Sequence, residues 1–168
     1  MHRISVSLGN IDDAIRQLEE YEKKVQKKIE AFLKRLLDEG VEIAEAKIVS
    51  LSAVESGELL GSIKPVQMDG NRGIVLVDNA HAVFVEFGTG VAKNGADRSH
   101  PKSGELGLSP IGTYGKKKGA NPDGWWYYDE KQGRKRWTKG MPSRPFMYET
   151  ARDLERKVVE IAREVFSQ

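Results

Sequence analysis

The stretch "HAVFVEFGTG", residues 81–90, combines residue types that could do chemistry. Glu86 lies within an apolar run and could act as a general acid or base. Gly88, Thr89 and Gly90 follow it, and clustered glycines can let backbone amides converge on a phosphate group. The stretch therefore raises two hypotheses, a catalytic carboxylate and a nucleotide-binding loop.

The spacing of these residues supports neither hypothesis. A phosphate loop of the G-x-G-x-x-G type needs a third glycine, but Gly90 is followed by Val-Ala-Lys. His81 lies five residues before Glu86, which would place the two on opposite faces of a strand. We expect instead that Glu86 pairs with an Arg or Lys of this subunit or of the next, and that Gly88 and Gly90 let the chain turn out of a sheet.

The remainder of the sequence contains no other catalytic or metal-binding pattern. There is no cysteine, and the three histidines, His2, His81 and His100, have no ligand spacing such as H-x-x-x-H. A G-x-S-x-G nucleophile elbow is absent. We therefore expect a protein that is not an enzyme, with no catalytic residue, no cofactor and no metal.

Length and hydropathy indicate a single globular domain spanning residues 1–168. No apolar run approaches the roughly 20 residues that a membrane span needs. Acidic residues near the N-terminus argue against a secretory signal. We expect no membrane partner.

Hydrophobic periodicity predicts an α+β fold with helices on either side of a small antiparallel sheet. Residues 10–55 are predicted to be helical, as one helix or a pair, with a bend or break near Gly40. Residues 63–88 are predicted to form the sheet, with a hairpin turn at residues 70–73 and a third strand over 81–88, where a short helix is the alternative. Residues 145–166 are predicted to form an amphipathic helix.

Residues 89–141 have the composition of a long insertion. Eleven of the seventeen glycines lie between residues 88 and 140. Within this glycine-rich segment, residues 125–129 and 134–138 are aromatic and β-prone, which predicts a second hairpin.

Charge is unevenly distributed along the chain. Residues 98–144 hold eleven Lys or Arg and four acids, a local charge of +7, and the net charge of +2 leaves −5 for the other residues. This pattern is typical of a protein that binds an anionic partner, or of one in which the basic segment of one copy fits an acidic face of another.

The basic segment also contains the densest group of aromatic residues. Basic and aromatic residues alternate over residues 116–139, as in a surface that binds single-stranded nucleic acid. The same types favour protein interfaces, and we prefer that interpretation. At least half of the four consecutive aromatics are expected to pack inward. The candidate interface residues are Trp125, Trp126, Tyr127, Tyr128, Arg134, Arg136 and Trp137.

Three motifs in this order resemble the tail-component family of siphophages and prophages, which comprises tail-completion, neck and minor tail proteins. The first comprises Ser56, Gly57, Leu59, Ser62 and Ile63. The second comprises Ala82, Val85, Glu86, Phe87, Gly88 and Thr89, followed here by Gly90, with His81 where the family usually has Tyr. The third comprises Arg144, Pro145 and Phe146. The resemblance extends over essentially the whole chain.

The resemblance implies a structural virion protein of the tail or neck that is assembled in the host cytoplasm. It also implies a homo-oligomer, a hexameric ring in the assembled tail, and other tail or neck proteins as partners. We expect Glu86 and Arg144 to pair with each other and to fix the geometry around Gly88-Thr89 and the start of the last helix. A nucleic-acid-binding module that uses residues 116–139 and a host-directed prophage protein remain as alternatives.

Overall fold

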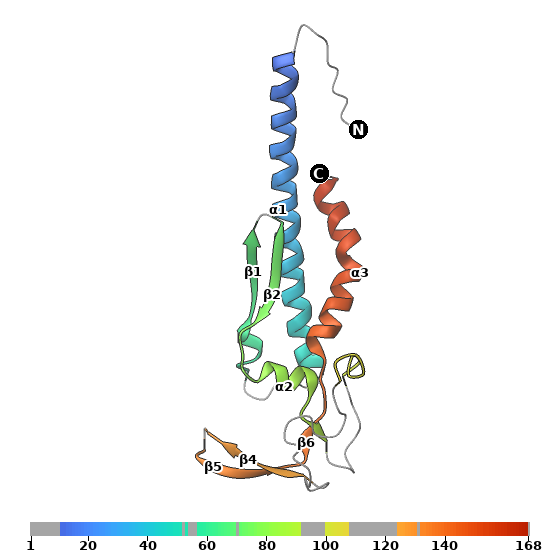
Figure 1. Ribbon diagram of the computed structural model, residues 1–168. Coiled ribbons are helices and arrows are strands. Elements are labelled where there is room, and N and C mark those ends of the chain that lie inside the picture. The colour runs from blue at the N-terminus through green and yellow to red at the C-terminus, as the bar shows by residue number, and fades with distance from the viewer. Residues whose placement is uncertain are drawn as a thin grey trace.

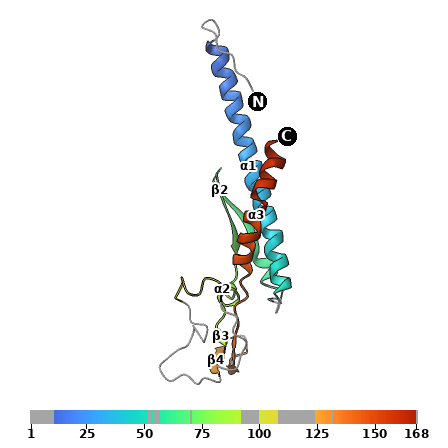
Figure 2. The ribbon, with the colours of Figure 1, turned by 90° about the vertical axis from the view of Figure 1, so that its right-hand side faces the viewer.

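A computed structural model describes residues 11–51, 53, 57–69, 71–91, 100–107, 124–130 and 132–167. The fold is α+β, as predicted, and the molecule is elongated (Figure 1). Helices α1 (Ile11–Ser50) and α3 (Phe146–Phe166) run antiparallel along its length. A β-hairpin lies against α1, and the remaining elements gather at the end where α3 begins (Figure 2).

Helix α1 is continuous over 40 residues, so the predicted break near Gly40 is wrong. Gly40 is buried, and a Cβ added there would lie 2.8 Å from Val75 Cγ2 and 3.3 Å from Leu154 Cδ2. The absence of a side chain therefore lets β2 (Arg72–Val77) and α3 approach the helix closely. Glycine weakens a helix by only about 1 kcal/mol, and packing on two sides compensates for that loss.

The predicted hairpin after α1 is confirmed. A short 3-10 turn, η1 (Leu60–Ser62), leads into β1 (Ile63–Asp69), which pairs antiparallel with β2. The register runs from Ile63 opposite Val77 to Asp69 opposite Arg72. In the turn, Asp69 Oδ1 accepts a hydrogen bond from the Asn71 N–H at 3.1 Å, as polar turn residues commonly do.

The predicted third strand is wrong, because residues 82–87 form a short helix, α2 (Ala82–Phe87). Ala82, Val85 and Glu86 are its buried residues. Their spacing of three and then one places them on the same side of a helix, whereas a strand would bury alternate residues. The sheet predicted over residues 63–88 therefore ends with β2.

Helix α3 confirms the helix predicted at 145–166, with Pro145 just before its first turn. The second predicted hairpin is confirmed as β4 (Trp125–Asp129) and β5 (Arg134–Thr138). The sequence did not reveal that β3 (Gly90–Val91) pairs with β6 (Gly140–Met141), which brings the two ends of the 89–141 segment together. Predictions for residues 92–99, 108–123 and 131 lie outside the described residues.

The hydrophobic core lies toward the same end of the molecule as α2. It joins the C-terminal part of α1 to η1, β1, α2 and the start of α3. Its buried residues are Ala44, Ile48, Ala53, Leu59, Ile63, Ala82, Val85 and Phe146. By contrast, Ile11, Ile15 and Leu18 at the other end of α1 are each about half exposed, although Ala14 between them is buried.

Two ion-pair groups join α1 to α3. Glu39 of α1 pairs with Lys157 of α3 and, at 3.1 Å, with Arg35 of its own helix. One turn nearer the start of α3, Lys47 Nζ lies 2.6 Å from Asp153 Oδ2. The pairs fix the register of the two antiparallel helices.

We predict that Gly40→Leu destabilises the protein by about 2 kcal/mol. Overpacking typically costs roughly 1–3 kcal/mol, and the gain in helix propensity of about 1 kcal/mol offsets only part of it. Urea unfolding provides the measurement, and Ala31→Leu at an exposed position of α1 is the matched control. A Gly40→Leu variant as stable as the control would show that the close packing at Gly40 is wrong.

Candidate functional site

The carboxylate of Glu86 caps the N-terminus of α3. Its Oε2 accepts a hydrogen bond from the Met147 N–H at 2.8 Å, and its Oε1 accepts one from the Tyr148 N–H at 3.0 Å. Both N–H groups belong to the first turn of α3, where no helical carbonyl is available to accept them. The side chain is buried, and the positive end of the helix dipole favours its negative charge.

His100 is the second partner of Glu86, and sequence reasoning missed it. Its Nδ1 accepts a hydrogen bond from the Lys102 N–H at 3.1 Å, so the proton of the neutral ring lies on Nε2. Nε2 then donates to Glu86 Oε1 at 3.2 Å. The buried ring also contacts Phe87 and Tyr148, with centroid separations of 4.7 and 5.5 Å. His100 thereby holds residues 100–107 against the body of the protein.

Within the described residues of one chain, Glu86 pairs neither with Arg144 nor with another Arg or Lys, so the expected pairing is wrong there. Arg144 contributes its backbone, because its N–H donates to the Val85 carbonyl at 2.8 Å. The Ser143 hydroxyl donates to the Glu86 carbonyl. A helix terminus and a histidine replace the expected cation, and the end of α2 is fastened to the chain that enters α3.

Gly88 and Thr89 continue this connection. The Thr89 N–H donates to the Met141 carbonyl, and the Met141 N–H donates to Thr89 Oγ1, both at 2.9 Å. Gly88 has φ 71°, and a Cβ there would lie 2.6 Å from Ser143 N. Only glycine combines this conformation with so close an approach. The Gly-Thr-Gly sequence thus serves as a turn out of α2 whose Thr89 amide is engaged within the protein.

Other motif residues build the core and its turns. The Ser62 hydroxyl donates to the Leu59 carbonyl at 2.7 Å, and both residues are buried. Gly57, with φ 74°, accepts a hydrogen bond from the Gly61 N–H at 3.1 Å. Phe146 is fully buried at the start of α3. Ser56 lies outside the described residues.

We call the residues around Glu86 the junction: 85–89, 100 and 141–148. It joins the end of α2, the paired strands β3 and β6, and the first turn of α3. The structure brings the second and third sequence motifs together here, although more than fifty residues separate them. The sequence order of the motifs was the only sign of this arrangement.

The candidate interface residues lie on the hairpin β4–β5, which extends below α2 in Figure 1. In the described part of the chain, β4 and β5 form a sheet only with each other. Trp126 and Tyr128 are 63% and 60% exposed, and Tyr127 is also exposed. The expectation that half of the four aromatics pack inward is therefore wrong, because Trp125 alone among them is partly buried.

Internal contacts stabilise this hairpin. Trp126 and Trp137 form an edge-to-face pair with centroids 5.4 Å apart. Arg136 forms an ion pair with Asp129 at 3.2 Å, across the two strands. Gly124 lets the start of the hairpin lie close to Trp137, where a Cβ would approach the ring to 2.9 Å. These contacts shape a two-stranded element that has a minimal core of its own.

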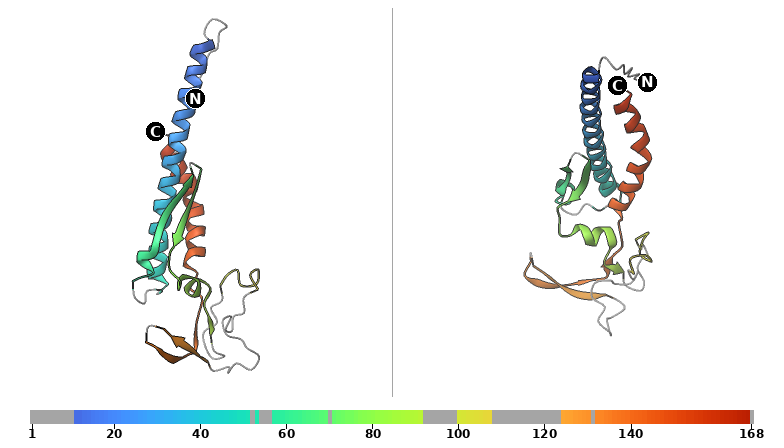
Figure 3. Two further views of the ribbon diagram at one scale, coloured as in Figure 1. Left: turned by 60° about the vertical axis from the view of Figure 1, so that its left-hand side comes forward. Right: turned by 45° about the horizontal axis from the view of Figure 1, so that its top comes forward.

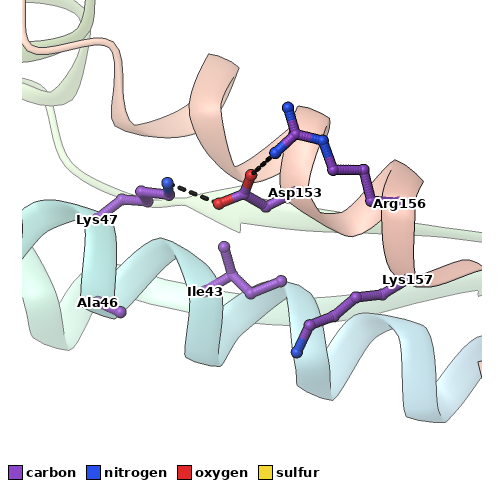
Figure 4. A pocket seen from close by; sticks show the side chains of 6 residues that line it. All are labelled: Ile43, Ala46, Lys47, Asp153, Arg156 and Lys157. Carbon is purple, nitrogen blue, oxygen red and sulfur yellow. Dashed lines mark hydrogen bonds and ion pairs between the residues drawn. The ribbon is translucent and has the colours of Figure 1, made fainter.

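A groove of about 410 Å³ opens between α1 and α3 (Figure 4). Ile43 and Ala46 of α1 lie along it, with Lys47 and Asp153 paired at one end. Arg156 NH1 also contacts Asp153, at 3.0 Å. The charged side chains that line the groove already form ion pairs, either between α1 and α3 or within α3. We therefore conclude that they stabilise the packing of α1 on α3.

The pKa values reflect these pairs. The Lys157 hydrogen bond lowers the pKa of Glu39 below its ordinary 4.5, against the opposing effect of burial, and Arg35 assists. The Lys47 hydrogen bond lowers the pKa of Asp153 in the same way. The Glu39 hydrogen bond raises the pKa of Lys157.

Among the described residues, no group of His, Asp and Glu side chains is arranged to hold a metal ion. None of the described helices combines the length and the apolar character that a membrane span needs.

Comparison with known proteins confirms the resemblance over the first half of the chain. Residues 12–88 match the family model described as "Bacteriophage HK97-gp10, putative tail-component". The match supports a structural role in a phage tail, a virion location and interactions with other phage proteins. It spans a little under half of the chain, and residues 144–146 lie beyond it. No curated protein and no solved structure matches the chain.

We predict that Glu86→Ala destabilises the protein by about 2 kcal/mol, because it leaves two part-buried N–H groups of α3 without an acceptor. Glu86→Gln retains one acceptor oxygen and should lose less. Thermal unfolding is the measurement, and Glu155→Ala on the exposed side of α3 is the control. Unchanged stability in Glu86→Ala would contradict the capping role.

We also predict that the Glu39 pair makes stability depend on pH. Since folding lowers the pKa of Glu39, its contribution is present above about pH 4.5 and is lost as pH falls through the lower folded value. The difference in unfolding free energy between wild type and Glu39→Gln should therefore shrink from about pH 7 to about pH 3. Asp153 titrates in both proteins and cancels. Glu45→Gln, an exposed position of α1, is the control, and a difference independent of pH would refute the assignment.

Proposed function

We propose that this protein is a tail-completion or neck component at the head–tail connection, and that it acts by forming a homo-oligomeric ring. Residues 1–168 then form one domain whose helices and hairpin β1–β2 are the subunit body. The protein has no enzymatic role in this proposal. Its partners are further copies of itself and other tail or neck proteins.

The observation that carries the proposal is the exposed hairpin β4–β5. Trp126 and Tyr128 present large aromatic surfaces to solvent, and exposed Lys135 lies opposite Tyr128 in the register. Clustered exposed aromatic residues beside cations are typical of interface centres. A two-stranded hairpin is marginally stable alone, so contact with another protein would stabilise it.

The junction supports the same proposal by fixing where the hairpin is presented. Hydrogen bonds between Thr89 and Met141 close the base of the 89–141 segment, and His100 holds it a second time through Glu86. A segment anchored in this way is directed to a defined place, which lowers the entropy lost on binding. A subunit that assembles with other proteins needs a binding segment whose position is fixed before contact.

Nucleic acid is the second candidate, because the aromatic and basic residues of the hairpin suit base stacking and phosphate contacts. Such binding should be tight and should weaken steeply with salt. Neutralising Lys116–Lys118 and Arg134–Arg136 should abolish it. The modest net charge of +2 favours protein partners.

The test is the mass of the purified protein in solution, measured by light scattering with and without the tail-tube protein of the same phage. We expect an oligomer in at least one condition, and a monomer after residues 125–138 are replaced by a Gly-Ser linker. A protein that is monomeric in both conditions would refute the ring. Nuclease treatment and a salt titration distinguish assembly on nucleic acid from assembly between proteins.

A further inference from the structure

We propose that the hairpin β4–β5 of one copy binds the acidic first part of α1, residues 11–22, in the next copy. The contact joins opposite ends of two molecules and so repeats from subunit to subunit. This inference rests on the proposed function, because it names the surfaces that would build the oligomer.

The hairpin provides a basic aromatic surface. Trp126 pairs with Trp137 and Tyr128 pairs with Lys135 in the register, which places all four side chains on one face. Residues 124–141 contain five Lys or Arg and two acids, a net charge of +3. This face is apolar enough to bury on contact and carries Lys135, and the segment around it is positively charged.

The first part of α1 provides the complementary surface. Ile11, Ile15 and Leu18 are separated by four and three residues, so they form one stripe, and each is about half exposed. Residues 11–22 contain five acids and one arginine, a net charge of −4. The five carboxylates lie at exposed positions around the stripe.

Helix α3 ends before it reaches this part of α1. Phe166, at the end of α3, contacts Phe32 with a centroid separation of 5.9 Å, and Lys28 Nζ donates to its carbonyl at 3.3 Å. Residues 11–22 lie beyond that point, where α1 projects past α3 (Figures 1 and 2). Among the described residues, α3 therefore leaves the stripe uncovered, with Ile11, Ile15 and Leu18 each about half exposed.

The two surfaces cannot meet within one molecule. Figure 3 shows the start of α1 and the hairpin β4–β5 at opposite ends of the structure from two further directions. Because the surfaces differ and complement each other, their contact is heterologous, and such contacts form rings when the rotation between subunits closes. A contact between two copies of residues 11–22 would instead bring two acidic segments together.

The test reverses the charge of each surface. One variant carries Glu19→Lys, Glu20→Lys and Glu22→Lys in α1. The other carries Arg134→Glu, Lys135→Glu and Lys139→Glu around the hairpin; Arg136, which is paired with Asp129, is left unchanged. All six positions are exposed, so both variants should fold, and circular dichroism and thermal unfolding check this.

We expect each reversed variant alone to have the mass of a single chain under conditions where the wild type assembles. An equimolar mixture, and a chain that carries all six changes, should recover the wild-type mass, because the charges are again complementary. The matched control has the same charge change on α3, Glu155→Lys, Glu160→Lys and Glu164→Lys, and should assemble normally.

The other outcomes separate this inference from the proposed function. If the wild type assembles and either reversed variant keeps its full mass, the hairpin–α1 contact is wrong and the ring proposal stands. If only the α1 reversal disrupts the oligomer, α1 binds another surface. If recovery requires nucleic acid, the hairpin is a nucleic-acid surface. A wild type that never assembles refutes both proposals.

Discussion

The buried carboxylate of Glu86 is the interaction on which the arrangement of this molecule depends. A buried charge is costly unless hydrogen bonds compensate for it. Here two N–H groups of α3 and the Nε2–H of His100 do so. One side chain thus joins α2, the start of α3 and residues 100–107, which are far apart in the sequence. Removing it would leave these two N–H groups of α3 without their acceptor and would take away the hydrogen bond that holds His100.

The molecule has one packed region and two parts that project from it. The core gathers where α1, α2 and α3 meet, around Phe146 and Ile48, which are both fully buried. The first turns of α1 and the hairpin β4–β5 extend from this core in opposite directions (Figure 1). Their apolar groups gain little from intramolecular burial, so much of the available binding energy remains for other molecules.

Local sequence patterns predicted the elements whose stability is local. The apolar spacing of α3 and the turn residues between β1 and β2 are sufficient signals, because helix faces and tight turns are set by neighbours in the chain. Predictions failed where distant packing decides. Gly40 suggested a break in the helix, but the side chains of Val75 and Leu154 pack against it and favour glycine there. Glu86 was expected to pair with a cation. The sequence does not show which distant side chain accepts hydrogen bonds from the first N–H groups of a helix, so the capping of α3 was missed.

Residues 82–87 show a different kind of failure. Their run of apolar residues suits a buried strand or a short helix, and six residues are too few for periodicity to decide. The burial of Ala82, Val85 and Glu86 settles the choice in the folded protein, because a strand would turn Val85 and Glu86 to opposite faces and expose one of them. His100 was missed for a related reason, since its role depends on a carboxylate and two aromatic rings that only the fold brings together.

The extent of the family match has a structural explanation. Residues 12–88 cover α1, the hairpin β1–β2 and α2, and they end at the turn that Gly88 makes. That part is incomplete as a folding unit, because Phe146 fills its core and the first turn of α3 binds Glu86. The junction therefore requires α3 whatever chain intervenes, and the segment between can vary in length and composition if its two ends meet as β3 and β6 do. In the function proposed above, the body built from α1, β1, β2, α2 and α3 carries this segment, and the hairpin β4–β5 within it makes the contact with other proteins.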